Sequence, residues 1–436
     1  MRLRLTLLLA VVAALLLAPG HAAAEPGGYL PGEVVVQYAP DLGPTVQASI
    51  ESLTGTAAED DLPGGSKRLR IEDGASVADT VSELRRDPRV AYAVPNHVAR
   101  ASAIQPNDPG FPLQWNFWGP YGINMPEAWS LASGRNAPGG RGAVVAVLDT
   151  GVAYRRLGAY RRAPDLASFA RGYDFVDGDR YPLDANGHGT HVSGTIAEST
   201  NNGIGAAGIA YRARIMPVRT LDAFGSGDAV TVSRGIRYAV RHDADVINLS
   251  LEFGPTVRAT DVPDVLAAIR FARRHGVVVT GVAGNSSDQQ VPYPARAKGV
   301  IAVGATTEHG CQAEYSNSGD DLDVTAPGGG DDALPGLDPW DQEHCTPGVP
   351  LHSVYQQTFS SALSRFGMPS GFYGTSMAAP HVAGLAALVI ASERLGPRPR
   401  PASVERLIEQ TARDIGPPGY DVRYGHGLID AAAALR

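Results

Sequence analysis

The chain has 436 residues, of which 44% are hydrophobic and 19% charged, with 51 glycines and 33 prolines. These proportions are typical of a globular protein with many turns and exclude a fibrous one, and the length predicts two or three domains. The formal charge of -8 is small for this size and no block of lysine or arginine is present, so we expect no nucleic-acid partner.

The first 24 residues have the pattern of a secretory signal peptide. Arg2 and Arg4 precede an apolar run from Leu5 to Leu17, and small residues follow up to Ala24. A membrane anchor is the alternative, but an apolar run of about 13 residues is shorter than the roughly 20 that span a bilayer. We therefore expect cleavage after Ala24, secretion of the chain into the extracellular space, and no membrane span in the remainder.

Residues 25–104 predict a small α+β domain. Strands are expected at 33–38, 69–71 and 90–94, and helices at 46–53 and 77–85. The stretch 101–110 is rich in Ala, Pro, Asn, Asp and Gly, and it predicts a linker to the rest of the chain.

The remainder, 105–436, predicts an α/β domain. Its nearly uninterrupted apolar runs are typical of parallel strands buried on both faces, and helix-like segments lie between them. The runs lie at 143–148, 246–251, 277–282 and 300–303, and the helix-like segments at 229–241 and 265–275. This alternation predicts a three-layer α/β fold, in which helices cover both faces of a mostly parallel sheet. The active site of such a sheet lies at the carboxyl ends of its strands.

The chain has only two cysteines, Cys311 and Cys345. Because both lie in the part expected to be exported, we predict that they form one disulfide, with two free thiols as the alternative. This bond would tether the Gly-, Pro- and Asp-rich stretch 328–371.

Two polar residues stand where chemistry is expected. Asp149 directly follows the apolar run 143–148, so its carboxylate reaches the ligand-binding edge, although capping a turn would also explain it. His188 lies between glycines at the start of a helix-like run, in Asn-Gly-His-Gly-Thr-His. His191 could join it in binding a metal, but the zinc motif needs histidines four apart with a glutamate between them. We therefore assign His191 a structural role.

Ser376 and Asn285 are two further candidates. Ser376 lies at the start of a long apolar helix, where the backbone N–H groups and the helix dipole can stabilise an oxyanion. A serine hydroxyl needs an adjacent base to become a nucleophile, and an ordinary N-cap would also explain this residue. Asn285 ends the run that begins at Val277, where its side chain could donate a second hydrogen bond to an oxyanion or simply form a turn.

Taken together, the segments around Asp149, His188 and Ser376 resemble the signatures of the subtilisin-like (subtilase) serine endopeptidases. Asp-Thr-Gly, His-Gly-Thr-His-Val-Ser-Gly-Thr and Gly-Thr-Ser-Met-Ala-Ala-Pro follow one another in the family's order, and the resemblance extends over residues 107–436. It implies that Asp149 orients His188, which acts as general base for the nucleophile Ser376. It also implies that Asn285 belongs to the oxyanion hole.

The resemblance implies a domain plan and partners as well. Residues 25–104 correspond to an inhibitory, ferredoxin-like propeptide that assists folding and is then removed, and 105–436 to the peptidase domain. The substrate-binding edge would contain Ser250, Leu251, Glu252 and Gly284. The expected partners are polypeptide substrates and the chain's own propeptide, and we expect a monomer.

Three other functions remain open at this point. A catalytically silent binding module could keep the scaffold, although the intact set of four residues argues against it. An α/β-hydrolase esterase is disfavoured, because Ser376 lacks the second glycine of Gly-x-Ser-x-Gly and the aspartate comes first in the chain. A transpeptidase would use the same acyl-enzyme.

The resemblance further implies calcium as a cofactor. The ligands of a first site would be all oxygens, as a hard cation prefers: Asp108, Asp165, the Asn202 side chain and the carbonyls of Thr200, Ile204 and Ala206. A simple turn at 201–203 is the alternative. A second, weaker site would use Asp174, Asp177 and Asp179, which could equally form a solvated loop.

One departure from the family concerns the substrate cleft. Glu252 and Phe253 follow Ser250-Leu251, where the family usually has glycines. We expect a narrower or more acidic cleft, in which Glu252 favours a basic substrate side chain.

Overall fold

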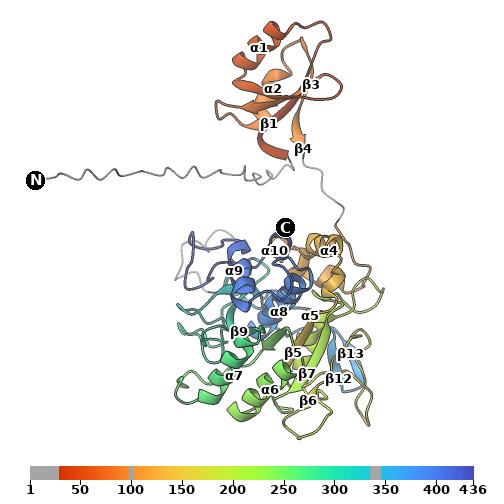
Figure 1. Ribbon diagram of the computed structural model, residues 1–436, viewed down its shortest axis with the longest axis vertical. Helices are drawn as coiled ribbons and strands as arrows, with labels where there is room; N and C mark the ends of the chain where they lie inside the picture. Colours follow the sequence, from red (N-terminus) through yellow and green to blue (C-terminus); the bar gives the residue numbers. More distant parts are fainter. Residues whose placement is uncertain (1–28, 98–102, 334–344) are drawn as a thin grey trace, which may run out of the picture. The chain divides into compact units, whose positions relative to one another are not determined.

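The computed structural model describes residues 29–97, 103–333 and 345–436 (Figure 1). The chain divides into two compact units, Met1–Ala101 and Ser102–Arg436. The signal peptide predicted at 1–24 lies outside the described residues, as do 98–102 within the predicted junction. The described ranges contain no helix whose length and apolar character would let it cross a bilayer.

The first unit is a four-stranded antiparallel sheet with two helices packed on it. Its elements are β1 (Tyr29–Tyr38), α1 (Pro44–Leu53), β2 (Thr56–Asp61), β3 (Ser66–Ile71), α2 (Val77–Leu84) and β4 (Val90–His97). The order β2-β3-β1-β4 is that of a ferredoxin-like fold. Alternate residues of β1, such as Val34 and Val36, meet Ile50 and Leu84 of the helices in one core. The predicted α+β architecture is therefore confirmed.

The second unit is built on a seven-stranded parallel sheet of order β11-β10-β9-β8-β5-β7-β6. Its strands are β5 (Val144–Asp149), β6 (Tyr173–Asp174), β7 (Arg214–Arg219), β8 (Val246–Leu249), β9 (Val278–Val282), β10 (Ile301–Thr306) and β11 (Val324–Pro327). Every residue of β5 is buried, as expected for a strand covered on both faces.

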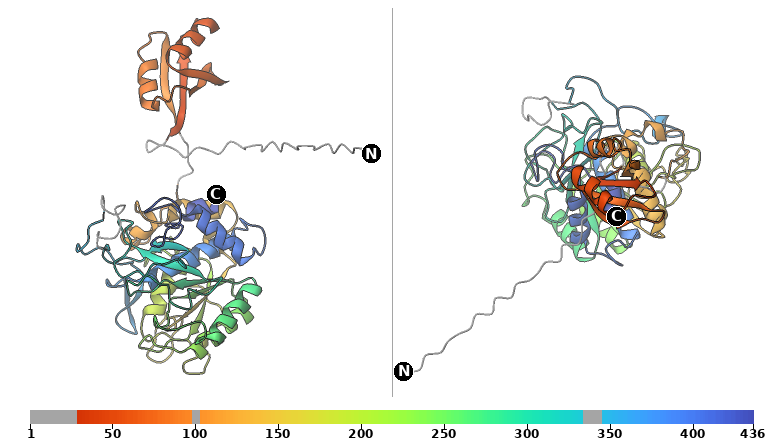
Figure 2. Two further views of the ribbon diagram at one scale, coloured as in Figure 1. Left: turned by 90° about the vertical axis from the view of Figure 1, so that its left-hand side faces the viewer. Right: turned by 90° about the horizontal axis from the view of Figure 1, so that it is seen from above.

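Helices cover both faces of this sheet, which gives the predicted three layers (Figure 2). The longer ones are α4 (Met125–Gly134), α5 (His188–Ala197), α6 (Ala229–Arg241), α7 (Pro263–Arg274), α8 (Thr375–Ala391) and α9 (Pro401–Thr411). The short ones are η1 (Phe111–Leu113), α3 (Trp115–Trp118), η2 (Pro138–Gly140) and α10 (Ala431–Leu435). Along β5, Val145 and Val147 pack towards α5 and α8, while Ala146 and Leu148 pack towards α6 and α7.

Two smaller features complete the second unit. A hairpin of β12 (Thr358–Ala362) and β13 (Arg365–Gly367) lies beside α5. A disulfide joins Cys311 to Cys345, whose Cα atoms are 5.9 Å apart.

Candidate active site

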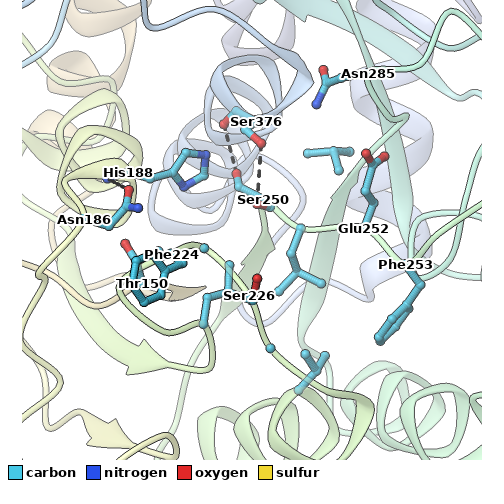
Figure 3. Close-up of a pocket in the computed structure, with 16 residues that line it drawn as sticks. Thr150, Asn186, His188, Phe224, Ser226, Ser250, Glu252, Phe253, Asn285 and Ser376 are labelled. Carbon is cyan, nitrogen blue, oxygen red and sulfur yellow. Dashed lines mark hydrogen bonds between the residues drawn. The ribbon is translucent and has the colours of Figure 1, made fainter.

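The carboxyl ends of β5, β8 and β9 meet the N-termini of α5 and α8 at one edge of the sheet. There a cavity of about 520 Å³ is lined by His188, Ser250, Asn285 and Ser376 (Figure 3). Asp149, the last residue of β5, lies behind His188. The sequence predicted this edge, because parallel strands bring their carboxyl ends to the same side.

The His188 imidazole is held by a buried carboxylate. Its Nδ1 lies 2.8 Å from Oδ1 of Asp149, which is 0% exposed, whereas a quarter of the His188 side chain remains exposed. The same Oδ1 accepts a hydrogen bond from the backbone N–H of Thr150 at 2.7 Å. Gly189 lets the start of α5 pack closely against the end of β5, since a Cβ there would lie 2.1 Å from the carbonyl oxygen of Gly151. The pair can therefore keep one tautomer of the imidazole, with Nε2 free to accept a proton.

The pKa of His188 reflects two opposing effects. Burial lowers this pKa, but the negative charge of Asp149, the hydrogen bond to it and the charge of Asp184 together raise it above its ordinary value of 6.5. The imidazole is thus a stronger base than a free histidine.

Ser376 is the second residue of α8. Its Oγ lies 3.5 Å from the carbonyl oxygen of Ser250, and the Ser250 hydroxyl donates to the carbonyl oxygen of Ser376 at 2.9 Å. Within the described residues these hydrogen bonds go to Ser250 and not to His188, although both side chains open into the same cavity (Figure 3). Such bonds often tighten only when substrate is present. The backbone N–H of Ser376 belongs to the first turn of α8, whose N–H groups have no partner within a helix.

The amide of Asn285 has a defined orientation. Its Oδ1 accepts hydrogen bonds from the backbone N–H of Thr375 at 2.8 Å and from the Thr375 hydroxyl at 3.0 Å. Because the oxygen is engaged in this way, the amide nitrogen is turned towards Ser376 (Figure 3). The arrangement can thus present two N–H donors to an oxyanion, one from Asn285 and one from the backbone of Ser376.

Asp184 is a functional residue that the sequence analysis missed. It is 0% exposed and accepts hydrogen bonds from the Thr150 hydroxyl, from the backbone N–H groups of Asn186 and Gly187, and from both N–H and hydroxyl of Thr190. These bonds tie the start of α5 to the end of β5. The spacing Asp184-x-Asn-Gly-His was the available signal, since an aspartate before a glycine often closes a turn onto the following backbone N–H groups.

Replacing Asp184 with alanine should remove the support of the His188 segment. Several buried donors would lose their acceptor, so we expect a loss of about 3 to 5 kcal/mol in the free energy of unfolding. Denaturant unfolding of the Ser376→Ala protein, chosen to prevent self-digestion, measures this change. Asp320→Ala is the control, because Asp320 is exposed and its carboxylate has no hydrogen bond among the described residues. Equal midpoints for both variants would contradict the assignment.

The four residues predicted for substrate binding lie on the two segments that border the cavity. Ser250, Leu251 and Glu252 line it directly, on the segment that follows β8. Gly284, after β9, has a φ of +101°, and a Cβ there would lie 2.5 Å from the Glu252 carboxylate. A side chain at 284 would therefore force the two segments apart.

The residues predicted for the first calcium site also come together. Asp108 is 2% exposed, and it accepts hydrogen bonds from the backbone N–H groups of residues 201–203. Asp165 is 1% exposed; its Oδ1 lies 2.6 Å from the Asn202 amide nitrogen, and its buried Oδ2 has no hydrogen-bond partner. Gly205 leaves room next to that oxygen, since a Cβ there would lie 2.1 Å from it. The donor set therefore fits a hard cation.

A buried glutamate beside this cluster escaped the sequence analysis. Glu198 is 0% exposed and its Oε1 has no hydrogen-bond partner. Burial raises its pKa well above the ordinary value and raises that of Asp165 to about 6, and the negative charges of the two groups reinforce this effect. The charge of the cluster is thus uncompensated within the described residues.

The second predicted calcium cluster has a different arrangement. Nη1 of Arg219 lies 2.8 Å from Oδ2 of Asp174 and 2.5 Å from Oδ2 of Asp177. Asp179 accepts a hydrogen bond from the backbone N–H of Tyr181. One guanidinium group thus contacts two of the three carboxylates and offsets one of their two negative charges, and the second calcium site stays a prediction.

His191, the other candidate metal ligand, packs into the core. Its ring stacks on Phe372 with centroids 4.4 Å apart, and its Nε2 lies 3.0 Å from the carbonyl oxygen of Val354. Burial lowers its pKa to about 3, so this histidine is neutral at physiological pH.

Comparison with known families matches both units of the chain. A model of the subtilase family matches residues 140–427, and a model of the fervidolysin N-terminal prodomain matches residues 18–96.

Known relatives agree with these matches. The chain is 35% identical over 402 residues to the thermophilic serine proteinase of Bacillus sp. (strain AK1), covering 92% of this chain and 87% of that protein. It is 36% identical over 332 residues to thermitase of Thermoactinomyces vulgaris, covering 76% of this chain and 99% of that protein. A solved protease structure from Pseudoalteromonas arctica superposes with a TM-score of 0.61 at 34% identity, covering 76% of this chain and 99% of the other. The chain therefore belongs to the subtilase family and is a subtilisin-like serine endopeptidase with an N-terminal prodomain.

Proposed function

We propose that this peptidase cleaves proteins through an acyl-enzyme on Ser376, with His188 as general base and Asp149 as its orienting group. One observation carries the assignment. The buried Asp149 holds the His188 ring in the same cavity into which Ser376 and the amide nitrogen of Asn285 open.

The reaction follows from these positions. His188 Nε2 takes the proton of the Ser376 hydroxyl as the oxygen attacks a peptide carbonyl, and then returns it to the departing amine. Asp149 stabilises the imidazolium formed in between. The negative charge that develops on the carbonyl oxygen is met by the N–H donors of Asn285 and Ser376. A water molecule then attacks the acyl-enzyme by the same steps and releases the carboxylic acid product.

Covalent labelling tests the nucleophile. A fluorophosphonate probe reacts with an activated serine, so we expect a single adduct, located at Ser376 by peptide mass spectrometry. An adduct on a different serine, or the absence of an adduct on the processed enzyme, would contradict the proposal.

The pH profile tests the base. His188 accepts a proton only when neutral, and because its pKa is raised, we expect kcat/KM to fall as the pH drops through a value above 6.5. His191 and His381 cannot cause this fall, since burial lowers their pKa values to about 3 and about 4. Rates on an uncharged peptide between about pH 5 and 9 give the profile, and a flat curve would rule His188 out as the base.

We also propose that calcium binds between Asp165, Asp108 and the loop 200–206. Support comes from the unpartnered Oδ2 of Asp165 and from the carbonyl oxygens of Thr200, Ile204 and Ala206, which accept no backbone hydrogen bond among the described residues. Bound calcium would supply the positive charge that the cluster lacks and would clamp the loop. No catalytic step depends on it.

Removing calcium should destabilise the folded protein. Free calcium at a hundred times its Kd would add about 2.7 kcal/mol, so we expect a clearly lower Tm in EGTA for the Ser376→Ala protein. Asp165→Asn should abolish the difference between the calcium and EGTA samples. Asp177→Asn, at the cluster held by Arg219, is the control and should preserve it. Equal Tm values in calcium and in EGTA for the Ser376→Ala protein without a further substitution would contradict the calcium proposal.

The organisation of the precursor completes the proposal. Residues 1–24 direct secretion, 25–104 inhibit and assist folding before self-cleavage, and 105–436 form the monomeric peptidase. Support comes from the division of the chain into two compact units and from the match of residues 18–96 to the fervidolysin N-terminal prodomain.

A further inference from the structure

Glu252 places a carboxylate in the hollow beside Ser376. The Oε2 of its carboxylate lies 2.5 Å from the position that a Cβ on Gly284 would occupy. The side chain therefore reaches from the segment after β8 to the segment after β9. Phe253, the next residue, also lines this hollow (Figure 3).

The location of the oxyanion donors identifies which part of a substrate would meet Glu252. The attacked carbonyl must lie against Ser376 Oγ with its oxygen towards Asn285. The residue that carries this carbonyl then starts its side chain within the same hollow, whose wall includes Leu251, Glu252 and Val282. Glu252 is thus positioned to contact the residue immediately before the scissile bond.

Among the described residues, no lysine or arginine lines the hollow that holds the Glu252 carboxylate. A second cavity of about 280 Å³ also has Glu252 and Phe253 in its wall and contains Asp288. Neither cavity has a lysine or arginine among its described lining residues. Burial raises the pKa of Glu252, the N–H of Asn285 lowers it and the charge of Asp288 raises it further, with a net increase. A substrate cation would relieve this unfavourable charge.

We propose that Glu252, supported by Asp288, makes this enzyme selective for peptides with arginine or lysine immediately before the scissile bond. The inference rests on the proposed function, because it takes Ser376 as the nucleophile. A charge-assisted hydrogen bond to a carboxylate in the pocket is the same physical basis by which an aspartate gives trypsin its preference for basic residues.

Peptides that differ in charge but not in shape provide the test. Two fluorogenic peptides carry either arginine or citrulline, its uncharged analogue, before the scissile bond, and a third carries alanine. We expect kcat/KM of the wild type to be about tenfold to a hundredfold higher for arginine than for citrulline. Glu252→Gln keeps the size of the side chain and removes the charge, so the ratio should fall to near one. Asp288→Asn should lower it by about two- to threefold, since this carboxylate acts from farther away.

The possible results distinguish a failure of the Glu252 selectivity proposal from a failure of the proposed Ser376 mechanism. A wild-type ratio near one overturns the selectivity without any variant, even if Glu252→Gln does not fold. An unchanged ratio in a folded Glu252→Gln protein does the same. Preference for alanine by both proteins would mean that residue 252 acts by blocking the hollow, which also overturns the proposal. Failure of the wild type to cleave any peptide or to be labelled at Ser376 would overturn the proposed function itself.

Discussion

Replacement of Ser376 by alanine is expected to abolish peptide hydrolysis and to leave the precursor uncut. The hydroxyl is the only group in the cavity that the proposed mechanism uses for covalent attack, so no acyl-enzyme can form without it. The loss of kcat should be about a million-fold, the size known for the nucleophile of subtilisin, a relative of this chain. Peptide kinetics give the rate, and intact mass gives the processing state.

Mixing experiments exclude trivial causes of this result. The Ser376→Ala precursor should keep its prodomain when incubated alone and lose it when a trace of wild-type enzyme is added, which shows that the junction is accessible in the variant. Maturation of the variant alone, in a host without extracellular proteases, would contradict Ser376 as the nucleophile of self-cleavage.

Replacement of Asn285 by alanine has the second-largest expected effect. One of two oxyanion donors disappears, which should lower kcat by about 100- to 1000-fold, as is known for the oxyanion asparagine of subtilisin. KM should hardly change, because this hydrogen bond strengthens only as charge develops in the transition state. Initial rates over a range of peptide concentrations separate the two parameters.

Thr375 offers a graded comparison for this prediction. Its hydroxyl is one of the two groups that hold the Asn285 oxygen, and its backbone N–H is the other. Thr375→Val keeps the backbone bond and the shape of the side chain, so kcat should fall far less than in Asn285→Ala. A raised KM with unchanged kcat in Asn285→Ala would show that the asparagine binds substrate rather than the transition state.

Much of the fold could be predicted because its core strands consist of continuous apolar runs. The runs 143–148 and 277–282 coincide with β5 and β9 to within one residue. Two of the strands that were missed, β2 and β6, lack this signal. Five of the six residues of β2 are alanines or acidic residues, four of them exposed, and β6 has only two residues. β2 is a strand because it pairs with β3, and β6 because it pairs with β7. A local sequence pattern does not indicate such a pairing.

The position of a candidate site residue could be predicted where its type and its place at a strand or helix end indicate that it lies at the edge of the sheet that holds the cavity. Asp149 and Ser376 are of this kind. Asp184 and Glu198 are not, because their importance lies in complete burial and in the donors around them, which depend on tertiary contacts. The second predicted calcium cluster also depends on a tertiary contact that no local pattern indicates. Its three acidic residues indicated a cation, but Arg219, at the end of a different strand, lies against two of them.

The site residues come from distant parts of the chain, and this has a consequence for how the enzyme first becomes active. Asp149 and His188 are 39 residues apart in sequence, while Asn285 meets Thr375 across 90 residues and Ser376 meets Ser250 across 126. Contacts of such separation form late and slowly, since the chain loses the entropy of large loops before it gains their energy. The triad therefore cannot assemble until α8 has docked on the sheet, and a chain that is still emerging or half-folded has no peptidase activity. Chain topology thus delays proteolysis independently of any inhibitor.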